Sequence, residues 1–346
     1  MGYFRDNVER VAGYTPGFQP KAGSVVKLNT NENPYPPSPE VMKTLAGMAP
    51  EQLRRYPDPV GQSFREAAGA VNGVGPDNIM CCNGGDDLLS IAIRACCDRQ
   101  RALAYPVPTY SLYPVLANLE DCKTLEIPFG DGFTLPAKLA KTDAALTIVC
   151  NPNAPTGTWI GVEDLATLAG DLTGVLLIDE AYVDFATYSA VSLVKEFDNV
   201  VLLRSMSKGY SLAGLRFGYA IGSETLIAGL LKVKDSYNVD ALAIALATAA
   251  IKDQAYFQAN VAKVQADRAA LTEQLRALDL EVGDSCTNFV LARVKTGSAG
   301  PVHEQLAQRD IYVRYFNVDG LSDKLRISVG TPEQNEKLLA ALREIL

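Results

Sequence analysis

The sequence of 346 residues is poor in the residue types on which several common kinds of site depend. It has one histidine, His303, so a metal centre built from histidines is excluded and a histidine base has a single candidate. The seven cysteines include two adjacent pairs but no C-x-x-C spacing, which argues against disulfides and tetrahedral zinc. We therefore expect no metal site, and reduced, mostly buried thiols in a cytosolic protein.

Charge and hydropathy restrict the partners further. The formal net charge is -8 and no block of lysine and arginine occurs, which argues against nucleic acid or an anionic membrane as a partner. No apolar run approaches the roughly 18 residues of a membrane span, and residues 1–6 lack the apolar segment of a signal peptide. The apolar segment Leu242–Ile251 is too short to span a membrane and predicts a buried helix. The sequence thus indicates a cytoplasmic protein.

Short apolar runs alternate with helical patterns from about residue 78 to 235. This alternation is typical of an α/β fold with a mostly parallel, mixed sheet flanked by crossover helices. A helix is predicted over Asp86–Cys97, with Leu88, Leu89, Ala92 and Ala95 on one face. The predicted strands of this region are Asn78–Cys81, Ala102–Tyr105, Leu146–Cys150, Val175–Ile178, Val200–Leu203 and Gly218–Ile221.

Three segments are expected along the chain. Residues 1–35 form an N-terminal arm that packs with the small domain and a partner subunit, and residues 36–238 form the large domain. Residues 239–346 form a small α+β domain, with strands at Asn288–Arg293 and Lys324–Val329 and a closing helix over 332–345.

Polar side chains follow the predicted strands at the edge where open parallel sheets bind ligands. Asp179 ends a strand that is apolar on both faces, where a carboxylate is costly without a partner. A protonated pyridinium nitrogen would be such a partner, and Tyr182 would then lie near the phenolic oxygen of the same ring. A helix cap or a Mg²⁺ ligand would also explain Asp179 considered alone.

The segment Ser205–Met206–Ser207–Lys208 lies just past the carboxyl end of another predicted strand. A lysine placed there, between hydroxyls and a glycine, can form an imine with an aldehyde cofactor. Ser205, Ser207 and Arg216 would then bind the phosphate of that cofactor, Arg216 through its two-pronged guanidinium. For an isolated S-x-S-K, a solvated turn is the common alternative.

Two further segments fit the same cofactor. Gly84–Gly85–Asp86 precedes the predicted helix, and free amides at a helix start can bind phosphate. Tyr110 follows the next strand and could stack on a flat ring, although core packing beside the neighbouring prolines would also explain it.

Together these residues resemble the fold-type I pyridoxal-phosphate aminotransferases, and among them most closely the histidinol-phosphate aminotransferases. The matching segments follow the family order over nearly the whole chain. They are Tyr14-x-Pro-Gly-x-Gln19-Pro20, Leu28-Asn29-x-Asn31-Glu32-Asn33-Pro34, Arg55-Tyr56-Pro57-Asp58, Gly84-Gly85-Asp86, Pro108-Thr109-Tyr110, Asn151-Pro152-Asn153-Ala154-Pro155-Thr156-Gly157, Asp179-Glu180-Ala181-Tyr182, Ser207-Lys208 through Ala213-Gly214-Leu215-Arg216, and Leu325–Thr331.

The resemblance implies pyridoxal 5'-phosphate as cofactor and a role for each matching residue. Lys208 would form the Schiff base, Asp179 would pair with the ring nitrogen and Tyr182 would bond the phenolic oxygen. Tyr110 would stack on the ring. The phosphate would be held by Gly85, Asp86, Ser205, Ser207 and Arg216.

The resemblance also implies an obligate homodimer, because Tyr56 is similar to a family tyrosine that reaches the phosphate in the neighbouring subunit. Arg326 resembles the arginine that grips a substrate carboxylate or phosphate. The residues expected to help it bind substrate are Tyr14, Asn31, Tyr237 and Arg314.

The chain departs from the family at Ala154, where many relatives have an asparagine that donates to the phenolic oxygen. Either Tyr182 makes that contact alone, or Asn153 shifts into the gap as a cofactor ligand. The expected reaction transfers an amino group from L-histidinol phosphate to 2-oxoglutarate, in histidine biosynthesis.

Other activities stay open on the same scaffold, because sequence cannot show how a substrate carboxylate is oriented. They are an aromatic aminotransferase and a threonine-phosphate decarboxylase. An alternative of another class is a module that senses the cofactor without turnover. Known regulators of that kind carry an added DNA-binding domain, for which we expect no room before the arm.

Overall fold

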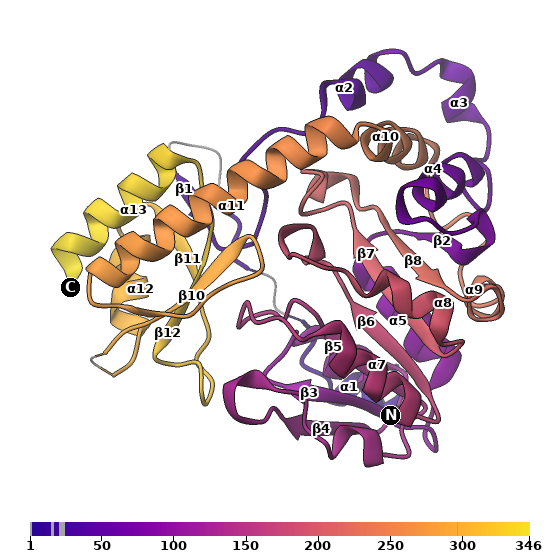
Figure 1. Cartoon of the computed structure of the whole chain (residues 1–346), viewed down its shortest axis with the longest axis horizontal. Coiled ribbons are helices and arrows are strands. Elements are labelled where there is room, and N and C mark those ends of the chain that lie inside the picture. Colours follow the sequence, from indigo (N-terminus) through magenta and orange to yellow (C-terminus); the bar gives the residue numbers. More distant parts are fainter. Residues whose placement is uncertain (1, 15–16, 21–24, 296) are drawn as a thin grey trace.

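The computed structural model describes residues 2–14, 17–20, 25–295 and 297–346. Thr15 and Pro16 of the arm motif lie outside the described residues. Two β-sheets organise the described chain, a larger one at the right of Figure 1 and a smaller one at the left. The α/β class expected from the sequence is confirmed.

The larger sheet has seven strands in the order β2-β8-β7-β6-β5-β3-β4. Neighbours from β7 to β4 run parallel, whereas β8 is antiparallel to both of its neighbours. The sequence predicted six of these strands to within about two residues at each end and missed β4. The strands are β2 Ile79–Cys82, β3 Leu103–Val107, β4 Thr124–Pro128, β5 Leu146–Cys150, β6 Val175–Asp179, β7 Val200–Ser205 and β8 Gly218–Gly222.

The central strands of this sheet are apolar on both faces because helices cover both faces. In β6, Leu176 and Ile178 join one core cluster while Leu177 joins the other, as the two-residue period of a strand requires. The covering helices are α4 Gln62–Asn72, α5 Gly85–Cys96, α6 Leu112–Leu119, α7 Val162–Asp171, α8 Leu193–Glu196 and α9 Glu224–Leu231. Helix α5 confirms the amphipathic helix predicted over 86–97.

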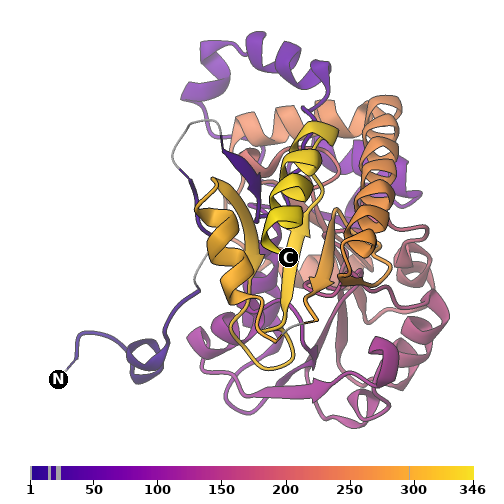
Figure 2. The ribbon, with the colours of Figure 1, turned by 90° about the vertical axis from the view of Figure 1, so that its left-hand side faces the viewer.

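The smaller sheet has five strands in the order β1-β11-β12-β10-β9. Strands β10 and β12 confirm two predicted strands, whereas β11 was missed and β1 lies inside the predicted arm. The strands are β1 Val26–Leu28, β9 Glu281–Val282, β10 Phe289–Arg293, β11 Ile311–Tyr315 and β12 Lys324–Ser328. Helices α11 Gln254–Ala277, α12 Gly300–Ala307 and α13 Pro332–Ile345 accompany this sheet, as the end-on view of Figure 2 shows.

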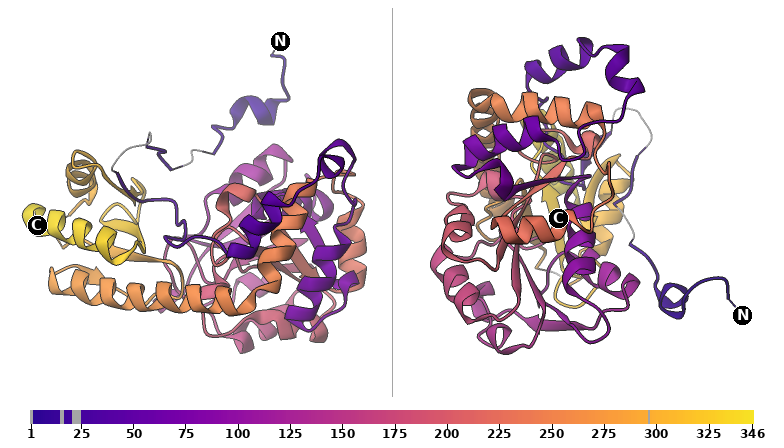
Figure 3. Two further views of the ribbon diagram at one scale, coloured as in Figure 1. Left: turned by 90° about the horizontal axis from the view of Figure 1, so that it is seen from above. Right: turned by 90° about the vertical axis from the view of Figure 1, so that its right-hand side faces the viewer.

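Two consecutive helices connect the sheets. Helix α10, Ala241–Lys252, packs against α4 and α2, Pro39–Ala46, and seven of its twelve residues are buried, in line with the buried helix predicted for this apolar segment. The long helix α11 then runs from α10 to the smaller sheet (Figure 3, left). Because both sheets are tied to this pair of helices, the carboxyl ends of β5, β6 and β7 come to face the smaller sheet.

The first residues of the chain reach back to the larger sheet through α1, Asp6–Arg10. The side-chain amide of Asn7 donates to the carbonyls of Asn118 and Leu119 at the end of α6, and Arg5 also donates to Leu119. A further short helix, α3 Pro50–Arg54, lies beyond α2. Among the described residues, no helix is long and apolar enough to cross a membrane.

Candidate active site

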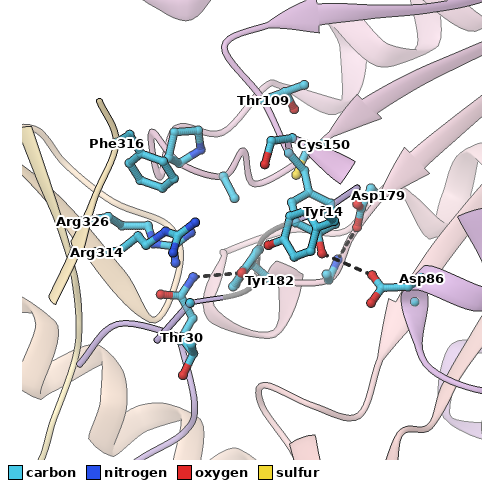
Figure 4. A pocket seen from close by; sticks show the side chains of 18 of the residues that line it. Tyr14, Thr30, Asp86, Thr109, Cys150, Asp179, Tyr182, Arg314, Phe316 and Arg326 are labelled. Atoms are coloured by element: carbon cyan, nitrogen blue, oxygen red, sulfur yellow. Dashed lines mark hydrogen bonds between the residues drawn. The ribbon is translucent and has the colours of Figure 1, made fainter. Parts of the chain in front are cut away.

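A cavity of about 910 Å³ opens between the carboxyl ends of β5, β6 and β7 and the smaller sheet. Its wall contains the polar residues that the sequence placed at strand ends, including Asp179, Ser205, Ser207 and Lys208. In Figure 4, Arg314 and Arg326 enter from one side, while Asp179 and Asp86 lie on the other. The cavity therefore joins a cationic wall from the small sheet to an acidic wall from the large one.

Lys208 follows β7 and projects into this cavity. Its Nζ donates to the carbonyl of Thr30 at 3.3 Å and lies 5.5 Å from the ring centroid of Tyr182. Burial and, to a smaller extent, the nearby cation Arg326 lower the pKa of Lys208 to about 8, against an opposing effect of Glu32. A lysine with such a pKa is partly neutral near pH 8, and a neutral amine is the form that attacks an aldehyde.

The backbone of this lysine is held as well. Asn33 donates from Nδ2 to the carbonyl of Lys208 at 3.0 Å. Because Asn33 and Thr30 belong to one segment, that segment contacts both the main chain and the ammonium group of Lys208. Contacts with a backbone carbonyl leave no side-chain pattern, so neither contact could be predicted from the sequence.

Asp179 is the last residue of β6 and is only 4% exposed. The hydroxyl of Tyr113 donates to its Oδ2 at 2.7 Å, and the amide of Ala181 donates to its Oδ1 at 3.1 Å. Burial raises the pKa of Asp179 to about 6, although these hydrogen bonds oppose the rise. The carboxylate is thus oriented but short of positive charge, as a site for a cation requires.

Tyr182 stands between Lys208 and the smaller sheet. Its hydroxyl oxygen accepts a hydrogen bond from Asn31 Nδ2 at 2.9 Å, and its ring packs edge-on against Phe289 at 5.2 Å between centroids. Burial raises the pKa of Tyr182 to about 12, so the hydroxyl keeps its proton at neutral pH. The residue can therefore donate a hydrogen bond to a ligand.

The start of α5 and the loop after β7 form one end of the cavity. Gly84 has φ of +83°, and a Cβ built on it would lie 2.6 Å from Arg216 Nη2, so glycine is needed there. The Arg216 guanidinium lies 3.4 Å from Ser207 Oγ and 3.5 Å from Asp86 Oδ2. Since the first amides of a helix lack acceptors, Gly85 and Asp86 offer their N–H groups beside this guanidinium.

Aromatic rings line the space between these two ends. Tyr110 packs edge-on against Tyr14 and against Tyr113, with centroids 5.9 and 5.6 Å apart. Its hydroxyl donates to Asp86 Oδ1 at 3.3 Å. Tyr110 and Tyr14 both line the cavity, as we expected from the sequence. Tyr113 was missed because it lies one helical turn beyond the motif that contains Tyr110.

Asn153 does not reach the cavity. It is buried at 1% exposure, and its amide bonds to Thr109 Oγ1, to the carbonyl of Pro108 and to Thr156 Oγ1. Ala154 lines the cavity in its place. The shift of Asn153 into the gap left by Ala154 is therefore absent from this structure.

Two expected site residues lie away from the cavity of their own chain. Tyr56 is 81% exposed and stacks on Tyr237, with centroids 4.5 Å apart and planes 16° apart. Neither ring lines the cavity of this chain. The expected homodimer would use this exposed pair, and the expected role of Tyr237 stays a prediction with it.

The remaining expectations concern the histidine and the cysteines. His303 lies in α12 with its ring 5.7 Å from that of Tyr315, and burial lowers its pKa. It does not line the cavity. The seven cysteines are free thiols and five are buried. Within the described ranges, no cluster of histidine, cysteine and carboxylate side chains could hold a metal ion.

Comparisons of sequence relate this geometry to known proteins. The sequence profile of the family Aminotransferase class I and II matches residues 23–342. Histidinol-phosphate aminotransferase 1 of Trichormus variabilis is 51% identical to the chain over 346 residues, covering 99% of each protein.

Comparisons of structure agree on the fold. The histidinol-phosphate aminotransferase of Sinorhizobium meliloti, solved in complex with pyridoxal-5'-phosphate, matches with a TM-score of 0.89 at 22% identity, over 100% of this chain and 99% of that one. The L-threonine-O-3-phosphate decarboxylase of Porphyromonas gingivalis matches with a TM-score of 0.81 at 23% identity, over 92% and 98%. Two different reactions share this fold, so the fold alone does not choose between them.

Proposed function

The chain belongs to the class I and II aminotransferases, and on that basis we propose that it transfers the amino group of L-histidinol phosphate to 2-oxoglutarate. The products are imidazole acetol phosphate and L-glutamate, a step of histidine biosynthesis, and the cofactor is pyridoxal 5'-phosphate. The observation that carries the proposal is the cavity that joins Lys208 and Asp179 to the paired cations Arg314 and Arg326. The relative of Trichormus variabilis, at 51% identity, supports the same substrate.

The residues present fit the cofactor. The cavity is large enough for cofactor and substrate together, and Gly84 leaves a cradle beside Arg216 that a Cβ would fill. Gly85 and Asp86 would bind the phosphate through their amides, together with Ser205, Ser207 and Arg216. The Asp86 carboxylate would repel a phosphate, so the useful group of Asp86 is its backbone N–H.

The other end of the cavity fits the ring. Asp179 would pair with the ring nitrogen, Tyr110 would stack on the ring and Tyr182 would donate to the phenolic oxygen. The bound ring supplies a conjugated system that accepts the electron pair left on the substrate carbon. The raised pKa of Asp179 is consistent with this pairing, because a buried carboxylate that lacks a cation gains most from receiving one.

Lys208 would hold the cofactor through Nζ and then act as the base. With substrate bound, its Nζ would take a proton from the substrate Cα and would deliver it to the cofactor carbon. The pKa of about 8 suits that work, since a base operates best when its pKa lies near the working pH. A lysine base also explains how the chain manages with one histidine, which lies outside the cavity.

Arg326 and Arg314 would bind the anion of each substrate in turn. Histidinol phosphate brings a phosphate ester, whereas glutamate brings carboxylates, and a guanidinium binds either group through two parallel hydrogen bonds. Tyr14 would close the same pocket beside Tyr110. We further propose a homodimer in which Tyr56 reaches the phosphate end of the neighbouring site.

A substrate panel tests the proposal. Purified protein loaded with pyridoxal phosphate would be assayed with histidinol phosphate, phenylalanine, tyrosine and threonine phosphate, each with 2-oxoglutarate as acceptor. The proposal expects glutamate to form fastest from histidinol phosphate. Release of CO₂ from threonine phosphate, or a preference for an aromatic amino acid, would replace it with one of the other reactions of this scaffold.

A further inference from the structure

We infer that Asn31 is a positioning residue that directs the hydroxyl proton of Tyr182 into the cavity. The inference rests on the proposed function, because that proton has a task only when Tyr182 faces a bound cofactor. It also assigns Asn31 a role different from the substrate contact expected from the sequence.

The hydrogen bond between Asn31 and Tyr182 has a defined direction. Asn31 Nδ2 donates to the Tyr182 oxygen at 2.9 Å. A tyrosine hydroxyl has one proton, and its oxygen can accept while that proton donates elsewhere. Since Asn31 occupies the oxygen as a donor, the proton of Tyr182 must point away from Asn31, and Tyr182 lines the cavity.

The orientation of the Asn31 side-chain amide determines whether its nitrogen or its oxygen faces Tyr182. Ser328 Oγ accepts from the Asn31 backbone N–H at 2.8 Å and donates to Asn31 Oδ1 at 3.0 Å. Ser328 is 2% exposed, and its hydroxyl has no other hydrogen-bond partner in the described part of the chain. If the amide were reversed, the buried Ser328 proton would lose its acceptor, and an unsatisfied buried donor is unfavourable. The nitrogen therefore faces Tyr182.

Contacts with the smaller sheet hold both Asn31 and Tyr182 in place. Asn31 is 1% exposed and has φ of +55°, a conformation that asparagine tolerates better than most residues. Its carbonyl accepts from Asn288 Nδ2 at 2.9 Å, and the next residue, Phe289, packs against the Tyr182 ring. Strands β10 and β12 thus fix both members of the pair.

Ala154 stands where many relatives have an asparagine. The methyl side chain of Ala154 lines the cavity but cannot donate, and the Asn153 amide is already bonded to its own loop. Neither residue offers a donor to the phenolic oxygen of the cofactor. The direction of the Tyr182 proton accordingly matters more here than in a site that has a second donor.

A spectroscopic consequence follows. A donor on the phenolic oxygen draws negative charge from it and weakens its hold on the proton shared with the lysine–cofactor linkage. Loss of the donor should therefore raise the pKa of that linkage, which is read from the visible absorption of the loaded protein as pH is varied. Tyr182→Phe should raise it directly, and loss of Asn31 should raise it through Tyr182.

The experiment compares these titrations in wild type, Tyr182→Phe, Asn31→Gly and the double variant. Glycine removes the amide yet accepts the positive φ of residue 31, so the backbone need not change. We expect Asn31→Gly to raise the linkage pKa by roughly 0.5 to 1, the equivalent of one hydrogen bond. The double variant should match Tyr182→Phe alone, because both changes remove the same contact.

Asn31→Asp is the second variant and keeps the size of the side chain. An ionised aspartate can only accept, so it would turn the Tyr182 proton toward itself and away from the cavity. It should raise the linkage pKa at least as far as glycine does. Asn335→Ala is the matched control, because it removes another buried asparagine amide, whose hydrogen-bond partner among the described residues is the backbone of Gly330. This control should lower the melting temperature and leave the linkage pKa unchanged.

Different results would contradict the proposed function and the positioning role of Asn31. If wild type shows no visible band that titrates with pH, the proposed function fails. If Tyr182→Phe shifts the band while both Asn31 variants leave it in place, the inference about Asn31 is overturned. An additive shift in the double variant, or an equal shift in Asn335→Ala, would overturn it as well.

Discussion

Arg314 and Arg326 are register partners on the adjacent antiparallel strands β11 and β12, so two guanidinium groups share one wall of the cavity. Both lie over the ring of Phe316, at 5.3 and 5.5 Å from its centroid. Burial lowers the pKa of Arg326, and the charge of Arg314 lowers it further. Two cations held this close together favour the presence of an anion between them.

The first prediction concerns the substrate anion. Arg326→Lys replaces a two-pronged donor with a point charge, so binding should weaken for both histidinol phosphate and glutamate. The loss should be about 1.5–3 kcal/mol for a hydrogen bond to a charged group, or roughly 10- to 150-fold in kcat/KM. Steady-state kinetics on both substrates measure it.

Arg293→Lys is the control for that prediction, because Arg293 lies in the same sheet but pairs with Glu281 and Asp323 at the surface. It should leave both Michaelis constants unchanged. If Arg326→Lys behaves like this control and merely lowers the melting temperature, Arg326 bridges the two sheets and does not bind substrate.

The second prediction is that replacing Asp179 raises the stability of the protein and lowers its activity. Its pKa of about 6 lies above the ordinary value of 3.8, so the carboxylate is ionised at neutral pH but its charge lowers the free energy of unfolding there. Asp179→Asn should therefore stabilise the cofactor-free protein at pH 7.5, by about 1 kcal/mol or 2–4 °C in melting temperature. The gain should vanish as pH falls below about 4, where aspartate is itself protonated.

The same variant should lose several orders of magnitude in kcat, because a neutral amide cannot hold the ring nitrogen in its protonated form. Calorimetry on the cofactor-free protein and an assay on the loaded protein measure the two effects. A destabilised but fully active Asp179→Asn would mean that the carboxylate is structural.

Much of the large sheet could be predicted because its central strands are buried on both faces and read as continuous apolar runs. Strand β4 could not, because it is an edge strand whose Thr124 and Glu126 face partly outward. Strand β1 was missed for a related reason. Its three residues form a strand only by pairing in parallel with β11, nearly 300 positions along the chain.

The residues of the site also fall into two groups, those that could be predicted from the sequence and those that could not. Side chains that line the cavity at strand ends, such as Lys208 and Asp179, stand in motifs and could be identified from the sequence. Tyr113, Thr30 and Asn33 contact these two residues, and only the folded arrangement shows those contacts. The sequence also could not show that the Asn153 amide is bonded within its own loop, because those hydrogen bonds depend on the folded arrangement.

The third prediction concerns Lys208. Burial lowers its pKa to about 8 from 10.5, so the amine of the cofactor-free protein is mostly charged below pH 8 and neutral above it. The rate at which the protein takes up pyridoxal phosphate should therefore rise with pH and level off above about 8. Stopped-flow absorbance in the visible range follows this uptake.

Lys208→Ala should lose that visible band and reduce turnover by several orders of magnitude, since nucleophile and base disappear together. Lys232→Ala, a lysine outside the cavity, is its control. Near wild-type turnover in Lys208→Ala would place the chemistry on another residue.

The fourth prediction concerns the dimer. In a mixture of Tyr56→Ala and Lys208→Ala subunits, each mixed dimer has one site with an intact Lys208 and an intact Tyr56 from the partner. Random exchange should then restore about one quarter of wild-type activity, because half of the dimers are mixed and each has one intact site of two. If Tyr56 served its own subunit, mixing the two variants would restore nothing.

The most direct measurement is an internal competition between two amino donors. Equal concentrations of histidinol phosphate and phenylalanine would be given to the loaded protein with 2-oxoglutarate, and mass spectrometry would follow both products at early times. We predict that imidazole acetol phosphate exceeds phenylpyruvate by roughly 10-fold or more, since a phosphate ester offers Arg314 and Arg326 one more oxygen acceptor and more negative charge than the carboxylate of phenylalanine does. Equal consumption of the two donors, or a preference for phenylalanine, would contradict it.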